Sequence, residues 1–166
     1  MILKGYSYLL GDDVNTDLII SGRYKFSISD MKELSQHILE DVDPNFYSKL
    51  KRGQSILVGG RNFGMGSSRE QAPIVIKEAG IVCVVARSFA RIFYRNAINI
   101  GLALVEADTT NIKEQDELSI DLERGILENT TQNYKLKTLP LPPVMVKLLS
   151  DGGLVEHFKK YGTIKL

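Results

Sequence analysis

The chain has 166 residues, enough for one domain to bury a sizeable core without disulfide or metal support. Hydrophobic residues make up 43% and charged residues 25%, as in an ordinary globular protein, and the formal net charge of +1 argues against a general nucleic-acid binder. The apolar runs are too short to cross a bilayer, and the first residues lack the apolar core and cleavage site of a signal peptide, so we expect a cytoplasmic protein with no membrane partner.

Strands and helices are predicted to alternate through the first two thirds of the chain. Residues 2–10 are rich in tyrosine and aliphatic side chains, which favours a strand, and residues 11–17 are dense in turn formers. Residues 29–41 have the apolar spacing of a helix, with Ser29 or Asp30 as its N-cap. The elements predicted after it are a short helix at 44–50, strands at 55–58, 81–86 and 102–106, and helices at 68–79 and 88–97.

The order strand, helix, strand, helix, strand is typical of a parallel sheet with helical crossovers. The rest of the chain predicts short antiparallel strands at 117–121, 126–128 and 134–137, a proline-rich connector at 139–143, and short helices at 144–150 and 154–160. We therefore expect a single α/β domain over residues 1–166, with a parallel βαβαβ core, a short antiparallel β subregion and C-terminal helices.

The most informative segment is 59–73, GGRNFGMGSSREQAP. A glycine-rich turn that opens a helix lets backbone N–H groups converge on an anion. Ser67, Ser68 and Arg69 add two hydroxyls and a planar cation at the same place, which suits a small molecule with several carboxylates. Ser67-x-x-Glu70 also matches a capping box, which gives these two residues a purely structural interpretation. Capping does not explain Arg69, because a cation at a helix N-terminus is locally unfavourable.

Three better-known motifs do not fit this segment. A Walker A loop needs a lysine after its last glycine, and Ser67 stands there. A dinucleotide-binding fingerprint needs a third glycine at the position of Arg69. The G-x-S-x-G elbow of serine hydrolases is absent as well. The segment is therefore interpreted as a cradle for a small polyanion rather than for a nucleotide.

Three arginines form a second candidate group. Arg87, Arg91 and Arg95 are spaced by four, so in a helix they stack along one side. The ordinary interpretation is a solvated or salt-bridged face. Without interleaved acids, they indicate a surface that faces an anionic ligand or the acidic residues of a partner chain.

Acidic and mixed residues near the N-terminus form a third candidate group. Asp12, Asp13 and Asp17 are a possible hard-metal set, but their spacing fits no EF-hand loop, so turn capping or pairing with a cation is favoured. Asp17 is a candidate for holding a guanidinium in position. The segment that follows, SGRYKFSISD, mixes charge and apolar bulk and is either a plain surface loop or a loop that discriminates between side groups of a ligand.

Cysteine and histidine give little indication of chemistry in this chain. Cys83 lies in the apolar run IVCVVA, where a small buried side chain is expected rather than a reactive thiol. One cysteine cannot supply the three or four thiolates that usually hold an iron–sulfur cluster, and we expect no metal site in this chain. His37 and His157 have no catalytic neighbour in the sequence and are expected to be surface or packing residues.

Three segments together resemble one family. GDDVNTDLI, GGRNFGMGSSREQAP and ARSFARIFYRNAINIGL, in this order, resemble the small subunits of isopropylmalate isomerases and their homoaconitase relatives, the swivelling domain of the aconitase superfamily. The likeness covers nearly the whole chain. It implies a swivelling β/β/α domain that is active only with a large subunit, which carries a [4Fe-4S] cluster. The reaction implied is the dehydration and rehydration of a small hydroxy-dicarboxylate, in leucine biosynthesis for an isopropylmalate enzyme.

The resemblance also implies roles for individual residues. Ser67 matches the family's base, acting as an alkoxide, while Ser68 and Arg69 match contacts to the substrate carboxylates. Asp17 matches an active-site aspartate in the NTD stretch. Cys83 matches no cluster ligand.

The side of the site that selects the substrate is expected at Arg23, Lys25 and Phe26. Phe26 can pack on an isopropyl group, which favours isopropylmalate, whereas Lys25 can instead meet a distal carboxylate. Small subunits of homoaconitase and of citramalate, methylmalate or dimethylmalate dehydratases stay open as alternatives. So does a non-catalytic module that binds a small polyanion. An RNA-binding role, which some aconitase relatives suggest, finds little support in the near-neutral charge.

Overall fold

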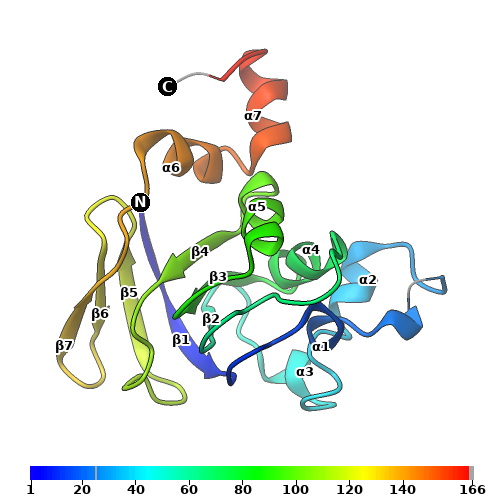
Figure 1. Ribbon diagram of the computed structural model, residues 1–166, viewed down its shortest axis with the longest axis horizontal. Coiled ribbons are helices and arrows are strands. Elements are labelled where there is room, and N and C mark those ends of the chain that lie inside the picture. The colour runs from blue at the N-terminus through cyan, green and yellow to red at the C-terminus, as the bar shows by residue number, and fades with distance from the viewer. Residues whose placement is uncertain (25, 165–166) are drawn as a thin grey trace.

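A single mixed sheet organises the protein (Figure 1). The computed structural model describes residues 1–24 and 26–164. Within them the strands are β1 (Ile2–Leu9), β2 (Ser55–Val58), β3 (Ile81–Ala86), β4 (Ala103–Glu106), β5 (Glu117–Asp121), β6 (Ile126–Asn129) and β7 (Tyr134–Lys137). They lie in the order β4-β3-β2-β1-β5-β6-β7. Strands β1 to β4 pair in parallel, and β5 to β7 extend the sheet from β1 in antiparallel pairs. The predicted parallel core with its antiparallel subregion is therefore confirmed.

Short helices surround the parallel half of this sheet. They are α1 (Thr16–Ile19), the 3-10 turn η1 (Gly22–Tyr24), α2 (Met31–Ser35), α3 (Phe46–Lys49), α4 (Gln71–Glu78), α5 (Arg91–Asn99), α6 (Pro143–Ser150) and α7 (Leu154–Tyr161). In Figure 1, α6 and α7 lie beyond α5, on the side of the molecule away from α3. None of the described helices is long and apolar enough to cross a membrane.

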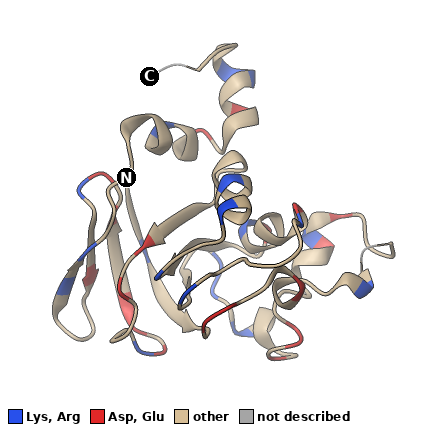
Figure 2. Cartoon of the chain, viewed as in Figure 1, with Lys and Arg blue, Asp and Glu red and all other residues tan. Residues whose placement is uncertain are grey.

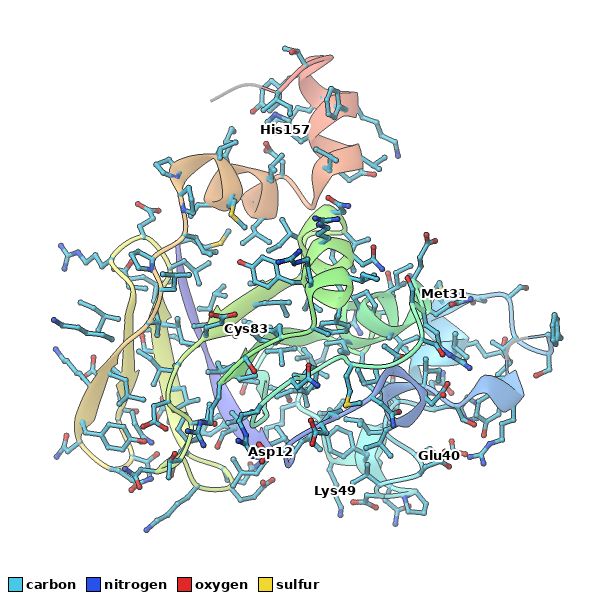
Figure 3. All side chains as sticks on the ribbon, viewed as in Figure 1. Asp12, Met31, Glu40, Lys49, Cys83 and His157 are labelled. Carbon is cyan, nitrogen blue, oxygen red and sulfur yellow. The ribbon has the colours of Figure 1, made fainter. Side chains whose placement is uncertain are left out.

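Apolar side chains cover both faces of the parallel half, because successive strand residues point to opposite faces. In β2, Leu57 belongs to one core cluster while Ile56 and Val58 belong to the other. In β3, Val84 packs on the side of Leu57 and Cys83 on the opposite side. Figure 3 shows Cys83 within the sheet. Burial raises the pKa of its thiol to about 12, so Cys83 is the small apolar residue that the sequence predicts.

Two predicted helices begin later than the sequence indicates. The helix expected from 68 begins at Gln71, and the helix expected from 88 begins at Arg91. Residues 88–90 cannot join α5 because their backbone pairs with Phe63: Phe63 N donates to Ser88 O at 3.0 Å and Ala90 N to Phe63 O at 2.9 Å.

The helix predicted at 29–41 is also shorter than expected. Of the two predicted N-cap candidates, Asp30 is the cap, and its side chain accepts from Lys32 N at 3.1 Å. Helix α2 nevertheless ends at Ser35. Leu39 has a left-handed φ of 51° and donates its N–H to Ile19 O at 2.9 Å, so this part of the chain turns to bond α1.

The two histidines pack against acidic partners. His157 is fully buried, with Nδ1 2.7 Å from Asp151 Oδ2. His37 stacks on Tyr24 and has Nδ1 2.5 Å from Glu40 Oε2. Both positions agree with the expected packing role.

Candidate active site

The candidate site lies where three loops meet at the carboxyl ends of β1, β2 and β3. The loop after β2, residues 59–70, runs between the loop after β1 and the loop after β3. It continues the parallel pairing in irregular form, with isolated bridges at Asn15–Met65 and Phe63–Phe89. On the β1 side, Gly60 N donates to Gly11 O, Asp13 N to Arg61 O, and Gly64 N to Val14 O, at 3.1, 2.8 and 2.7 Å. This framework holds a glycine-rich loop in a defined shape.

Glycine is required at two points of this loop. Gly64 has a left-handed φ of 84°, and a Cβ built on it would stand 2.2 Å from Phe93 Cγ. A Cβ on Gly60 would stand 1.9 Å from Asp12 Oδ1. Asp12 uses this oxygen to accept from Arg61 N at 2.7 Å, and this backbone hydrogen bond holds the pKa of Asp12 below its usual range. Asp12 therefore caps a turn, as the sequence favours.

Thr16 and Asp17 contact the serine loop, as we call residues 59–70, and Asn15 caps the helix that carries them. Asn15 Oδ1 accepts from Leu18 N at 2.7 Å and caps α1. Thr16 Oγ1 donates to the carbonyl of Ser67 at 2.7 Å. Asp17 Oδ1 lies 2.6 Å from Arg69 Nη2, so Asp17 holds a guanidinium. The sequence indicated Asp17 but missed Thr16, whose only signal was its place beside Asp17.

The serine loop and α5 enclose a cavity of about 230 Å³. Ser67 and Ser68 are both exposed at it. Within the described residues, neither hydroxyl makes a hydrogen bond to another protein group, so both are available to a ligand. The cavity is lined by Thr16, Gly64, Gly66, Ser67, Ser68, Arg69, Ala90, Arg91, Ile92, Phe93 and Asn96.

The capping-box interpretation of Ser67 and Glu70 is wrong. Helix α4 begins at Gln71, and Glu70 stands at the N-cap with helical angles and no side-chain capping bond. Ser67 lies three residues before that cap, and within the described residues its hydroxyl accepts from no backbone N–H, so it does not cap α4. Helix capping therefore does not explain the serine at position 67.

Arg69 is held from two sides. Its side chain is 25% exposed and pairs with Asp17. A Cβ built on Gly22 would stand 2.8 Å from Nη2 and 3.2 Å from Nη1, so the guanidinium lies directly against the backbone of the 3-10 turn η1. Gly22, which has no side chain, therefore leaves space for the guanidinium of Arg69.

The three arginines do not form the predicted stripe. Arg87 precedes α5 and lines a separate depression with Asp12 and Thr109. Arg91 is the first residue of α5 and lines the cavity of Ser67, and Arg95 is exposed one turn further on. Figure 2 shows these basic positions as blue segments of α5. The reason is the late start of α5, which leaves Arg87 in a loop.

Two of the residues expected to select the substrate, Arg23 and Phe26, do not line this cavity. Arg23 Nη2 lies 3.0 Å from Glu40 Oε1 and 2.9 Å from Asp41 Oδ1, so its guanidinium is engaged away from Ser67. Phe26 is 95% exposed. Lys25 lies outside the described residues.

Comparisons with known proteins identify the relatives of this chain. The aconitase C-terminal domain family matches residues 17–110, more than half of the chain. A 3-isopropylmalate dehydratase small subunit 2 of Archaeoglobus fulgidus is 50% identical over 166 residues, all of both chains. A small subunit 1 of the same name from Thermotoga maritima is 44% identical over 98% of both chains.

A solved structure is similar over nearly the same length. The crystal structure of a 3-isopropylmalate dehydratase (leuD) from Methanocaldococcus jannaschii has a TM-score of 0.91 at 46% identity, and the match covers 98% of this chain and 96% of that one. The chain therefore belongs to the aconitase C-terminal domain family and, within it, to the 3-isopropylmalate dehydratase small subunits.

Proposed function

We propose that this chain is the small subunit of a 3-isopropylmalate dehydratase, a hydro-lyase that interconverts 2- and 3-isopropylmalate by dehydration and rehydration in leucine biosynthesis. The observation that carries the proposal is the hydroxyl of Ser67, which bonds no other group within the described residues and faces a cavity that Ser68, Arg69 and Arg91 also line. The full-length relatives of that name support the same activity.

Ser67 is proposed as the base that removes a proton from the carbon next to a substrate carboxylate. A serine hydroxyl is a weak acid, so its alkoxide needs positive charge and N–H donors close by. Arg69 and Arg91 supply positive charge at the same cavity.

Arg69 and Ser68 are proposed to bind the substrate carboxylates. A guanidinium offers five N–H donors in a planar fork, and Asp17 engages only Nη2. Among the described residues no other acceptor bonds this guanidinium, so its remaining donors are available to a carboxylate, while Asp17 keeps the fork oriented.

An iron–sulfur cluster does not fit the residues of this chain. Cys83 is the single cysteine, it is fully buried in β3, and burial raises the pKa of its thiol to about 12. Among the described residues, no group of three or more His, Cys, Asp or Glu side chains is placed to hold a metal ion. We therefore propose that the [4Fe-4S] cluster of this chemistry belongs to a separate large subunit, in a cytoplasmic complex.

The test is an assay of the chain reconstituted with a cluster-bearing large subunit. Isopropylmalate, homocitrate, citramalate and dimethylmalate are compared by kcat/KM, and isopropylmalate is expected to be the preferred substrate. Turnover of homocitrate well above isopropylmalate would overturn the substrate assignment. A chain that forms no complex and adds no activity would instead be a polyanion-binding module.

A further inference from the structure

The carboxylate of Glu40 joins two segments beside the candidate site. Tyr24 Oη donates to Glu40 Oε1 at 2.5 Å, and Arg23 Nη2 lies 3.0 Å from the same oxygen. His37 Nδ1 lies 2.5 Å from Oε2 and donates, because a carboxylate only accepts. The rings of His37 and Tyr24 stack with their centroids 4.0 Å apart. We call Arg23, Tyr24, His37 and Glu40 the Glu40 latch.

The latch is built to stay closed near neutral pH. Hydrogen bonds from Tyr24 and then His37 hold the pKa of Glu40 below its usual range, so the carboxylate is charged. Its side chain is 26% exposed, which makes its charge-assisted bonds stronger than those of a fully exposed pair. Arg23 has a second acidic partner in Asp41, so both of its contacts fix the same segment.

The segment held by the latch touches Arg69 on its other side. Gly22 lies two residues before Tyr24, and its backbone lies against the guanidinium of Arg69. Arg69 is thus confined between Gly22 and Asp17. Because η1 spans only residues 22–24, the position of Gly22 depends on where the latch holds Tyr24.

We propose that Glu40 is a positioning residue for substrate binding, which fixes η1 against Arg69 and so sets the angle at which the guanidinium meets a substrate carboxylate. The inference rests on the proposed function, in which Arg69 binds that carboxylate. Glu40 does not line the cavity, so it acts through Arg23 and Tyr24, which it bonds, and through Gly22 beside them. A guanidinium fork binds a carboxylate by planar alignment, so a small tilt weakens the contact.

The test compares Glu40→Gln and Tyr24→Phe with the wild type in the complex with the large subunit, using isopropylmalate. The substrate carboxylate that Arg69 binds is present in the ground state and in the transition state alike. A misplaced Arg69 is therefore expected to raise KM about five- to tenfold while kcat stays within about twofold. A merely structural role would lower the folded fraction, and hence kcat, at unchanged KM. The control Glu123→Gln removes an exposed pair with the N-terminus and is expected to change neither constant.

A double-mutant cycle tests whether Glu40 acts through Arg69. In an Arg69→Lys background, Glu40→Gln is expected to raise KM by less than about twofold, since the positioned group is gone. Independent effects of the two substitutions would overturn the proposal. The absence of isopropylmalate turnover in the wild-type complex would instead refute the proposed function.

A second readout needs no partner subunit. The Nε–H resonance of Arg69 in the isolated chain, assigned by its loss in Arg69→Lys, is expected to shift in Glu40→Gln and in Tyr24→Phe, but not in Glu123→Gln. An unshifted resonance in both latch variants would overturn the proposal.

Discussion

Ser67 owes its proposed reactivity to its surroundings. Thr16 Oγ1 donates to the carbonyl of Ser67 at 2.7 Å and so fixes its backbone. The hydroxyl of Ser67 makes no hydrogen bond within the described residues. Arg69 and Arg91 line the same cavity. A serine in this setting is placed for chemistry rather than for capping a helix. Replacing it distinguishes the two roles, because a catalytic serine affects activity and a capping serine affects stability.

Ser67→Ala is expected to lower kcat by about 10²- to 10⁴-fold, because a positioned general base contributes on that order to proton transfer. Complex formation and the melting temperature are expected to stay unchanged, because the hydroxyl bonds no other described group. Steady-state kinetics and thermal unfolding measure the two effects. Ser29→Ala is the matched control, since Ser29 is also exposed and its hydroxyl bonds no other described group. A fall in melting temperature that parallels the loss of activity would indicate a structural serine.

At the scale of elements, strands were predicted better than helix starts. The strands at 55–58 and 81–86 follow from short apolar runs and match β2 and β3 in full. The starts of α4 and α5 could not be predicted, because residues before them pair with loops far away in sequence. Thr16 and Ser67 are 51 positions apart, and a local pattern such as the Ser67–Glu70 capping box does not register that bond.

The glycine loop gives a prediction at this scale. Gly64→Ala is expected to lower the free energy of unfolding by about 2 to 4 kcal/mol, from an unfavourable left-handed φ and from overpacking against Phe93. Urea denaturation measures the change. Gly11→Ala is the matched control, since a Cβ there meets nothing within 4 Å, and it is expected to stay within about 0.5 kcal/mol of the wild type. Equal stability of the two variants would contradict the account of this loop.

At the scale of the whole molecule, the sequence predicted the parallel and antiparallel parts of the sheet but not the order of the strands. The parallel core followed from alternating elements, whereas the central place of β1, between β2 and β5, joins segments more than 100 residues apart. Ser7 makes this join specific, because its hydroxyl bonds Lys113 O and accepts from Asp116 N at 2.9 Å. Such long-range pairing leaves no mark in a local pattern.

The C-terminal helices depend on one buried carboxylate, and this gives a pH prediction. Asp151, with a 3% exposed side chain, pairs with His157 at 2.7 Å and with Lys160 at 3.1 Å, and the His157 bond chiefly holds its pKa below the usual range. A lowered folded-state pKa stabilises the fold above the unfolded pKa near 4, and this stability is lost as pH falls through the folded value. The urea concentration at the unfolding midpoint is therefore expected to decrease as the pH is lowered below about 4. The decrease is expected to be less steep in Asp151→Asn. Identical pH profiles for the wild type and Asp151→Asn would contradict this role, and Glu123→Gln is the control.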